Sequence, residues 1–407
     1  MAQEFRPDSV DALRDIVAGA LADGTPLQVL GAGSKEAFGR PLDLPRLRVD
    51  RLSGIVSYEP EELVMTAAAG TPMAEIEARL ADNRQQLAFE PADYGALLGG
   101  EPGRGTIGGV LACNLSGPRR IKAGAARDHF LGVQVVTGRG ELIKAGGRVV
   151  KNVTGYDLCK LLAGSFGTLA AMTEVSLKVL PAAEETRTLL LAGLKPADGL
   201  GALRAAMASA YDVAGTAYLP AAAAACCTVL SDAGTGVAAM RLEGPGPSLR
   251  HRVDALKDLL RLPEAEIDEL DTPRSQSLWR ELRDVALLPA TSLLWRISAP
   301  PGAGAALLEA LAPLHPQWLA DWAGGLIWLA LDDPVAADLA DGGAATIRSA
   351  LAAHGGHATL IRADAGLRGT IDVFQPQPAP LARLSARVKE SFDPGHILNP
   401  GKMYRDF

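Results

Sequence analysis

The chain has 407 residues, of which 48% are hydrophobic and 21% charged, and its formal net charge is −7. This composition is typical of a globular protein with two or three domains, and the acidic balance argues against nucleic acid as a partner. No apolar run approaches the roughly 18 residues of a membrane helix, and the charged N-terminus lacks the apolar core of a signal peptide. We therefore expect a cytoplasmic protein with no direct membrane span, which reaches the inner face of a membrane only through partners.

The four cysteines, Cys113, Cys159, Cys226 and Cys227, form no C-x-x-C motif. Their spacing excludes the usual four-thiolate iron–sulfur clusters and zinc ribbons. We interpret them as small buried thiols of a protein in a reducing compartment.

The N-terminal region begins with a predicted helix that Asp8 or Ser9 caps and Gly24 ends. A short buried strand, residues 27–30, leads directly into the sequence GAGSK, residues 31–35. Glycines in such a loop let consecutive N–H groups point the same way, which makes an anion-binding concavity. The spacing of a P-loop is absent, and a plain tight turn is the alternative interpretation.

Strands are predicted at residues 56–58 and 63–67, followed by a helix with Thr71 as its cap and Pro72 at its first position. This order of two strands and a helix favours an α+β arrangement over a strict alternation of strands and helices.

Three glycines further along, Gly103, Gly105 and Gly108, spell G-x-G-x-x-G, with Asp128 beyond them. A Rossmann fingerprint needs a strand directly before the first glycine and a full helix after the last. Here glycine and proline precede the motif, and only one or two helical turns fit after it. The context therefore argues against a nicotinamide site.

The next segment predicts a strand at 130–137, a hairpin partner at 141–145, a short helix at 160–164 and a strand at 172–180 that Pro181 ends.

The composition changes after Pro181, where a pattern of strand, helix, two strands and helix occurs roughly twice. The predicted helices are 197–210, 247–262, 302–311 and 335–354, and the predicted strands are 186–191, 238–242, 293–297 and 326–331. This order suits helices on one side of an antiparallel sheet. All five tryptophans lie in this region, either as core residues or as a wall that faces a ligand or partner.

The stretch from Gly103 to Pro181 resembles the FAD-binding domain of the vanillyl-alcohol-oxidase superfamily, the PCMH-type fold. KNVTGYDLCKLLAGSFGTL within it and the ending FDPGHILNPGKM resemble the FAD-binding, E-type subunits of glycolate oxidase. The resemblance implies an α+β protein: a two-subdomain FAD-binding fold plus an α+β cap domain with an antiparallel sheet. It implies domains at 1–182 (FAD-binding) and 183–361 (cap or partner domain), with segment 362–407 returning to the first.

The resemblance places FAD on two loops. A pyrophosphate needs converging N–H donors and no bulky side chains, and GAGSK offers one such wall while residues 106–109 offer the other, with a threonine hydroxyl. The implied cofactor residues are Gly31, Ala32, Gly33, Ser34, Lys35, Thr106, Ile107, Gly108, Gly109, Asn114, Ser116, Gly117, Gly167, Thr168, Glu174, Val175 and Asn399.

Two positions depart from the family pattern. Ala32 replaces the middle of three glycines, which is tolerable unless that residue needs a positive φ. Lys35 stands where relatives with covalent flavin often carry histidine, so we expect a non-covalent FAD.

Four basic residues follow the second loop: Arg119, Arg120, Lys122 and Arg127. Three interpretations remain open, namely a solvated surface loop, an arginine near the flavin edge and a partner-docking patch.

No catalytic residue and no metal site is evident. The metal-binding H-x-x-D-G-N-x-H motif of the family's catalytic members is absent, and the nearest candidate, His354 and His357 in HGGH, more simply forms a polar turn. The resemblance implies a flavin subunit for oxidation of glycolate or another small 2-hydroxy acid, beside a D-type flavoprotein and an iron–sulfur F-type subunit. The alternatives are a scaffold with no redox step and a self-sufficient D-2-hydroxy acid dehydrogenase.

The C-terminal region contains a predicted helix, residues 381–392, and then DPGHILNPGKM. The resemblance implies that this tail returns to the flavin domain, where Asn399 and Lys402 reach the flavin ring or phosphate. A surface tail is the alternative.

Overall fold

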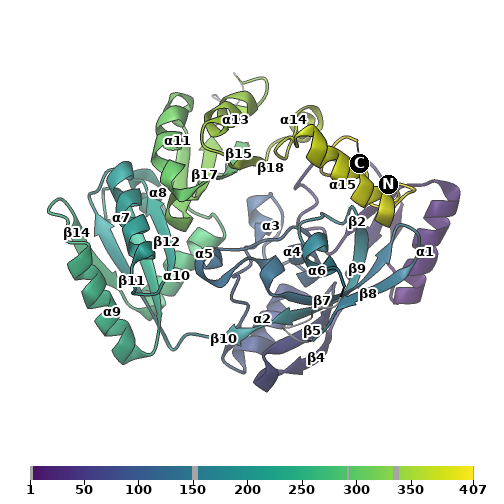
Figure 1. Ribbon diagram of the computed structural model, residues 1–407, viewed down its shortest axis with the longest axis horizontal. Coiled ribbons are helices and arrows are strands. Elements are labelled where there is room, and N and C mark those ends of the chain that lie inside the picture. Colours follow the sequence, from purple (N-terminus) through teal and green to yellow (C-terminus); the bar gives the residue numbers. More distant parts are fainter. Residues whose placement is uncertain (1–2, 149–154, 291–292, 333–338, 407) are drawn as a thin grey trace. The chain divides into compact units, whose positions relative to one another are not determined.

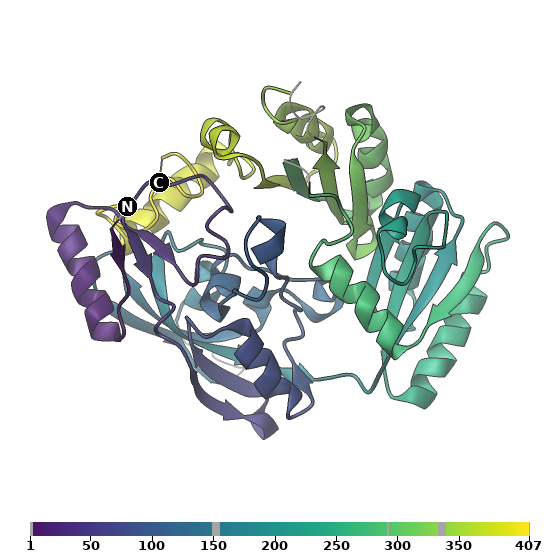
Figure 2. The ribbon, with the colours of Figure 1, turned by 180° about the vertical axis from the view of Figure 1, so that it is seen from behind.

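The computed structural model describes residues 3–148, 155–290, 293–332 and 339–406, and the chain divides into two compact units (Figures 1 and 2). The first unit comprises residues 1–116, 124–182 and 372–407, and the second comprises 117–123 and 183–371. The expected boundaries differ from these in two places. Residues 117–123 belong to the second unit, and the chain returns to the first at residue 372 rather than 362.

A parallel three-stranded sheet of order β1-β3-β2 opens the first unit: β1 (Glu4–Phe5), β3 (Arg46–Arg48) and β2 (Gln28–Leu30). Helix α1 (Val10–Asp23) packs beside it and buries Leu13 and Val17 in a core that also holds Ile397 and Leu398 of the C-terminal tail. The predicted caps are confirmed. The Ser9 hydroxyl accepts from the N–H of residue 12, and the glycine at 24 has a left-handed φ of 62°.

An antiparallel five-stranded sheet forms the rest of this unit, in the order β4-β5-β9-β7-β8. Its strands are β4 (Ile55–Glu59), β5 (Val64–Ala68), β9 (Ala170–Lys178), β7 (Phe130–Thr137) and β8 (Leu142–Gly146). A two-stranded ladder joins β6 (Gln85–Gln86) to β10 (Leu180–Pro181). The predicted hairpin is confirmed, since β7 pairs with β8 over five residue pairs.

Short helices connect these strands: α2 (Met73–Ala81), α3 (Tyr94–Leu97), α4 (Ile107–Ala112) and α6 (Leu158–Leu162). The prediction that Thr71 caps α2 is wrong, because Pro72 occupies the cap position. The Thr71 hydroxyl instead donates to the carbonyl oxygens of Ala68 and Gly54, which ties the end of β5 to the preceding loop.

The second unit contains one eight-stranded antiparallel sheet of order β14-β11-β13-β12-β16-β17-β15-β18. Its first half is β11 (Glu185–Ala192), α7 (Pro196–Ala208), β12 (Val213–Leu219), β13 (Val237–Gly244), α9 (Gly246–Leu259) and β14 (Glu266–Leu270). Its second half is β15 (Leu293–Ser298), α11 (Gly304–Leu311), β16 (Gln317–Asp321), β17 (Leu326–Leu331), α13 (Ala344–Ala352) and β18 (His357–Arg362). Each half is a β-α-β-β-α-β unit, so the expected repeat is confirmed.

Four further α-helices lie in the second unit: α5 (Arg120–Ala123), α8 (Ala221–Ala225), α10 (Thr272–Arg283) and α14 (Ala365–Thr370). The prediction of a helix over 335–354 is wrong for residues 339–343, because Gly342 and Gly343 have left-handed φ values of 60° and 82° and α13 starts only after them. Residues 335–338 of that prediction lie outside the described residues.

Tryptophans pack inside the second unit. Trp279 and Trp295 are fully buried, and their indole N–H groups donate to the Thr188 hydroxyl and the Gly342 carbonyl. The core interpretation therefore holds for these two.

Helix α15 (Ala379–Phe392) and the tail that follows return to the first unit. Within the described ranges, no helix combines the length and the apolarity needed to cross a membrane.

Candidate cofactor site

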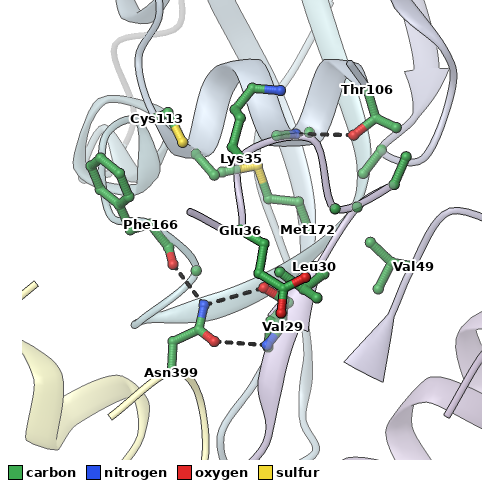
Figure 3. A pocket seen from close by; sticks show the side chains of 18 of the residues that line it. Val29, Leu30, Lys35, Glu36, Val49, Thr106, Cys113, Phe166, Met172 and Asn399 are labelled. Carbon is green, nitrogen blue, oxygen red and sulfur yellow. Dashed lines mark hydrogen bonds between the residues drawn. The ribbon is translucent and has the colours of Figure 1, made fainter. Parts of the chain in front are cut away.

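A pocket in the first unit opens where β2 ends, between the GAGSK loop, helix α4, the turn at residues 166–167 and the C-terminal tail (Figure 3). Its volume is about 740 Å³ when the space open to solvent is counted. It is lined by Gln28, Val29, Leu30, Gly31, Ala32, Gly33, Ser34, Lys35, Glu36, Val49, Ala69, Thr106, Gly108, Gly109, Ala112, Cys113, Phe166, Gly167, Ala170, Met172, Asn399 and Lys402.

The GAGSK loop uses its carbonyl groups and leaves its amides available. The Ala32 carbonyl accepts from Arg48, and the carbonyls of Gly33 and Lys35 accept from later amides of the same loop. No hydrogen bond within the described chain uses the amides of residues 32–35. Consecutive amides of this kind form an anion-binding concavity, so the predicted first wall has the chemistry that a pyrophosphate requires.

The alanine at position 32 is compatible with this loop. Ala32 is not among the residues with positive φ, whereas Gly33 has a φ of 85°. A Cβ at position 31 would lie 2.4 Å from the Thr106 hydroxyl oxygen. The glycines at 31 and 33 are therefore the ones that the geometry requires, and the methyl at 32 is harmless.

The second wall differs from the expectation. Thr106 caps α4, with its hydroxyl 3.4 Å from the Gly109 amide. The amides of Ile107 and Gly108 donate to the carbonyls of Thr71 and Ala69. These three amides already have partners inside the protein, so they are not spare donors for a phosphate. This wall lets a ligand approach the backbone closely, because its glycines carry no side chain.

The Lys35 side chain extends from its loop towards α4 (Figure 3). Its Nζ donates to the Ser34 hydroxyl, 3.1 Å away, and a Cβ added at Gly109 would lie 3.5 Å from Nζ. Burial lowers the pKa of Lys35, and the neighbouring Cys113 and Asp93 oppose that shift. An anion in the pocket would favour the charged form of this amine and oppose the lowering of its pKa.

Cys113 also lines the pocket, and burial raises its pKa to about 11, although Lys35 and Lys402 act in the opposite direction. The thiol is therefore protonated near neutral pH. All four cysteines are free, and the expectation of burial is wrong for Cys226, which is exposed at the end of α8.

The C-terminal tail contributes Asn399 and Lys402 to the pocket wall. The Asn399 side-chain oxygen accepts from the Val29 amide (2.7 Å), and its NH₂ donates to the carbonyls of Phe166 (2.7 Å) and Val29 (3.3 Å). The Lys402 Nζ donates to the carbonyls of Glu36 and Arg40. Both side chains therefore hold backbone segments of the pocket.

Six of the expected cofactor residues lie outside the pocket besides Gly117: Ile107, Asn114, Ser116, Thr168, Glu174 and Val175. Asn114 and Ser116 accept from the amides of Arg127 and Ala126, so they shape the next loop. The residues at 174 and 175 sit inside β9, between β5 and β7, where the ladders use the backbone. Gly117 belongs to the second unit, where its carbonyl accepts from the Trp322 indole.

The basic residues after the second loop have separate environments. Arg119 pairs with Glu243, at 2.6 Å from Nη2, and Lys122 pairs with Asp212. The Arg120 guanidinium lies 4.5 Å from the centre of the Trp322 ring. These contacts anchor residues 117–123 within the second unit, while Arg127 is exposed.

Sequence reasoning missed the apolar lining of the pocket. Val49 and Met172 come from separate segments that no local motif marks, and Phe166 lies within the KNVTGYDLCKLLAGSFGTL motif but was not predicted as a site residue. Met172 lies in β9, which the sheet order places next to β5.

Comparisons with known proteins agree with this geometry. A protein-family model described as "FAD binding domain" matches residues 2–146. Glycolate oxidase subunit GlcE of Escherichia coli (strain K12) is 35% identical over 405 residues, 98% of this chain and 98% of that protein. Glycolate oxidase subunit GlcD of Bacillus subtilis (strain 168) is 45% identical over 85 residues, 21% of this chain and 18% of that protein. The solved structure of p-cresol methylhydroxylase with substrate bound has a TM-score of 0.72 at 14% identity, over 99% of this chain and 90% of that one.

The fold, the matched domain and the phosphate-compatible loop together define a FAD-dependent oxidoreductase of the PCMH type. Within that class, the chain belongs to the GlcE family of glycolate oxidase subunits. The expected family, fold class and FAD cofactor are thereby confirmed. The residues present fit the cofactor, since available amides and a half-buried lysine meet in a pocket with apolar walls.

Proposed function

We propose that the chain is the FAD-binding subunit of a glycolate oxidase complex and contributes a flavin to the oxidation of glycolate to glyoxylate. The observation that carries this proposal is the similarity to GlcE, at 35% identity over 98% of both proteins. Because the match extends over both units, it supports a shared role for the whole chain and not only a shared cofactor domain.

The pocket supports a non-covalent FAD held mainly by the GAGSK loop. The amides of residues 32–35 and the Lys35 ammonium would bind the pyrophosphate, and Val49 and Met172 supply apolar walls. When bound, FAD supplies the acceptor for the hydride that leaves the hydroxyl-bearing carbon of the substrate. The residues of this chain bind and orient the cofactor, and we assign no catalytic base to any of them.

We further propose a complex with a D-type flavoprotein subunit and an iron–sulfur F-type subunit, in the cytoplasm at the inner face of the membrane. The names of both curated relatives, GlcE and GlcD, contain the word "subunit". The cysteine spacing assigns any iron–sulfur cluster to a partner. The second unit is then the cap or partner domain.

A scaffold that adds no redox step is the second candidate. The observation that favours it is the absence of the family's H-x-x-D-G-N-x-H motif from the sequence. The nearest histidines, His354 and His357, flank a turn between α13 and β18, in which Gly355 and Gly356 have positive φ. A self-sufficient dehydrogenase is the third.

Spectroscopy of the purified chain separates these functions. We expect flavin absorption bands from the chain alone and release of the flavin on acid denaturation. A chain without flavin supports the scaffold, and a flavin retained by the denatured chain contradicts the non-covalent assignment. Anaerobic glycolate should bleach the flavin only in the presence of the partner subunits. Bleaching by the isolated chain would support the self-sufficient dehydrogenase instead.

A further inference from the structure

The C-terminal tail meets three segments of the pocket in the first unit. Its Leu398 forms an isolated bridge with Leu27 at the start of β2. Asn399 links β2 to the turn at residues 166–167, and Lys402 holds the loop at residues 36–40. We call residues 397–402 the clasp. Its side chains hold both sides of the pocket entrance, so its own position must be fixed.

A buried ion pair fixes that position. Lys389, in the last turn of α15, and Asp393, just after it, both have side chains that are 0% exposed. The Lys389 Nζ donates to an Asp393 carboxylate oxygen (2.6 Å), to the Thr168 carbonyl (2.6 Å) and to the Leu398 carbonyl (2.8 Å). All three of its N–H bonds are used.

The carboxylate of this pair points back into the clasp. The two Asp393 oxygens accept from the amides of Ile397 (2.9 Å) and Leu398 (2.8 Å). A Cβ at Gly138 would lie 2.0 Å from one of these oxygens, so β7 also approaches the pair closely. The pair therefore joins helix α15, the clasp and the turn that begins at Ser165.

Buried ion pairs are poor sources of stability, because desolvation offsets much of their attraction, and apolar replacements are often as stable. Their best-supported use is to fix one arrangement among several. An apolar residue at 389 would fill the same space but would hold neither the Thr168 carbonyl nor the Leu398 carbonyl. Phe166 and Gly167, which line the pocket, directly precede Thr168 in the chain. The position of this turn therefore affects the shape of the pocket.

We propose that Lys389 and Asp393 are positioning residues for the cofactor pocket: they lock the clasp to the 165–168 turn so that Asn399 holds that turn and β2 at the spacing FAD requires. This inference rests on the proposed use of the pocket for FAD. A wall that is ordered before binding costs the ligand less conformational entropy, so the pair acts on FAD affinity through preorganisation.

The test is the dissociation constant of FAD, measured by flavin fluorescence on the full chain after reconstitution of the apoprotein. The main variant is the double change Lys389→Met with Asp393→Asn, which leaves no unpaired charge. We expect FAD affinity to fall at least tenfold and the visible circular dichroism of bound flavin to change. Asp393→Asn alone keeps the shape of the carboxylate, and we expect a loss of a few fold. In this single variant Lys389 keeps its hydrogen bonds to the Thr168 and Leu398 carbonyls, and it answers the question if the double variant does not fold.

Two controls separate positioning from general destabilisation. Arg387→Met changes an exposed side chain on the same helix and should leave affinity unchanged. Leu80→Ala empties part of a buried site in α2 and should lower the melting temperature without changing the affinity of the folded protein. Wild-type affinity and dichroism in both pair variants would overturn the proposal, as would an equal loss of affinity in Leu80→Ala.

A failure of the pocket assignment gives a different result. In that case Gly109→Val, which fills the pocket itself, would also leave FAD binding unchanged. If Gly109→Val abolishes binding while the pair variants bind normally, the pocket assignment stands and the positioning role fails.

Discussion

The two units differ in whether their polar groups have partners within the protein. In the first, the amides of residues 32–35 and the half-enclosed Lys35 face a pocket (Figure 3). In the second, Arg241 is buried, 4.5 Å from the Trp279 ring, and within 3.6 Å of Glu243, which also pairs with Arg119. Polar groups held by their own unit indicate packing, whereas converging donors left available indicate a ligand. This contrast indicates that the first unit holds the cofactor and that the polar groups of the second unit serve packing.

The largest expected effect is on the stability of the second unit. Trp279→Ala removes a fully buried indole, its hydrogen bond to Thr188 and the ring beneath Arg241. Core substitutions of this type cost about 3–5 kcal/mol. Denaturant unfolding should show this loss, while the FAD dissociation constant of the folded protein stays unchanged. A parallel loss of FAD affinity would contradict the assignment of the cofactor to the first unit alone.

Filling the pocket should abolish cofactor binding. In Gly109→Val the new Cβ would lie 3.3 Å from the Thr106 hydroxyl and 3.5 Å from the Lys35 Nζ, and the methyl groups extend into the space between them. We expect FAD affinity to fall at least 100-fold, about 2.7 kcal/mol. Flavin content after purification is the measurement, and a normal flavin content would contradict the assignment of this pocket to FAD.

The charge of Lys35 should make FAD binding depend on pH. Burial lowers the Lys35 pKa in the free protein, and a bound pyrophosphate raises it, so binding takes up a proton between the two values. FAD affinity should therefore weaken as pH rises through this window. In Lys35→Met we expect about tenfold weaker binding, about 1.4 kcal/mol, and no such pH dependence. Titrations of both proteins across alkaline pH provide the check, and identical slopes would exclude Lys35 from the site.

The same shift affects the stability of the apoprotein. Because the folded-state pKa of Lys35 is lowered, the unfolded chain binds more protons between the two values, and the contribution of this group to stability rises with pH through that window. Lys35→Met should remove this pH-dependent contribution to the free energy of unfolding, which urea unfolding at several pH values measures. An unchanged pH slope would show that the folded apoprotein leaves Lys35 fully hydrated.

The smallest effect belongs to an exposed helix position that serves as a control. Gly19 lies on the outer face of α1, and a Cβ there would meet no atom within 4 Å. Gly19→Ala should stabilise the protein by about 0.5–1 kcal/mol and leave FAD binding unchanged. Thermal unfolding measures the first and fluorescence titration the second. A destabilised variant would show that α1 packs differently.

Local sequence signals determined much of this protein. Glycine spacing after β2 identified the loop at residues 31–35, and the caps Ser9 and Gly24 fixed the ends of α1. The pattern of strand, helix, two strands and helix, repeated in the second unit, was predicted, although strands β12, β14, β16 and β18 were not located. These features depend on interactions between residues close in sequence, so they can be read without the fold.

Tertiary structure decided which of the candidate residues meet. Ile107, Asn114 and Val175 belong to cofactor-like motifs, yet their backbone or side-chain groups are used by neighbouring segments, whereas Val49 and Met172 line the pocket without any motif. Asn399, which the resemblance implies as a cofactor residue, lines the pocket, and its side chain also links β2 to the 166–167 turn. The physical reason is that hydrogen-bond partners and pocket walls come from residues distant in sequence, and only the packed chain specifies which groups remain available for FAD.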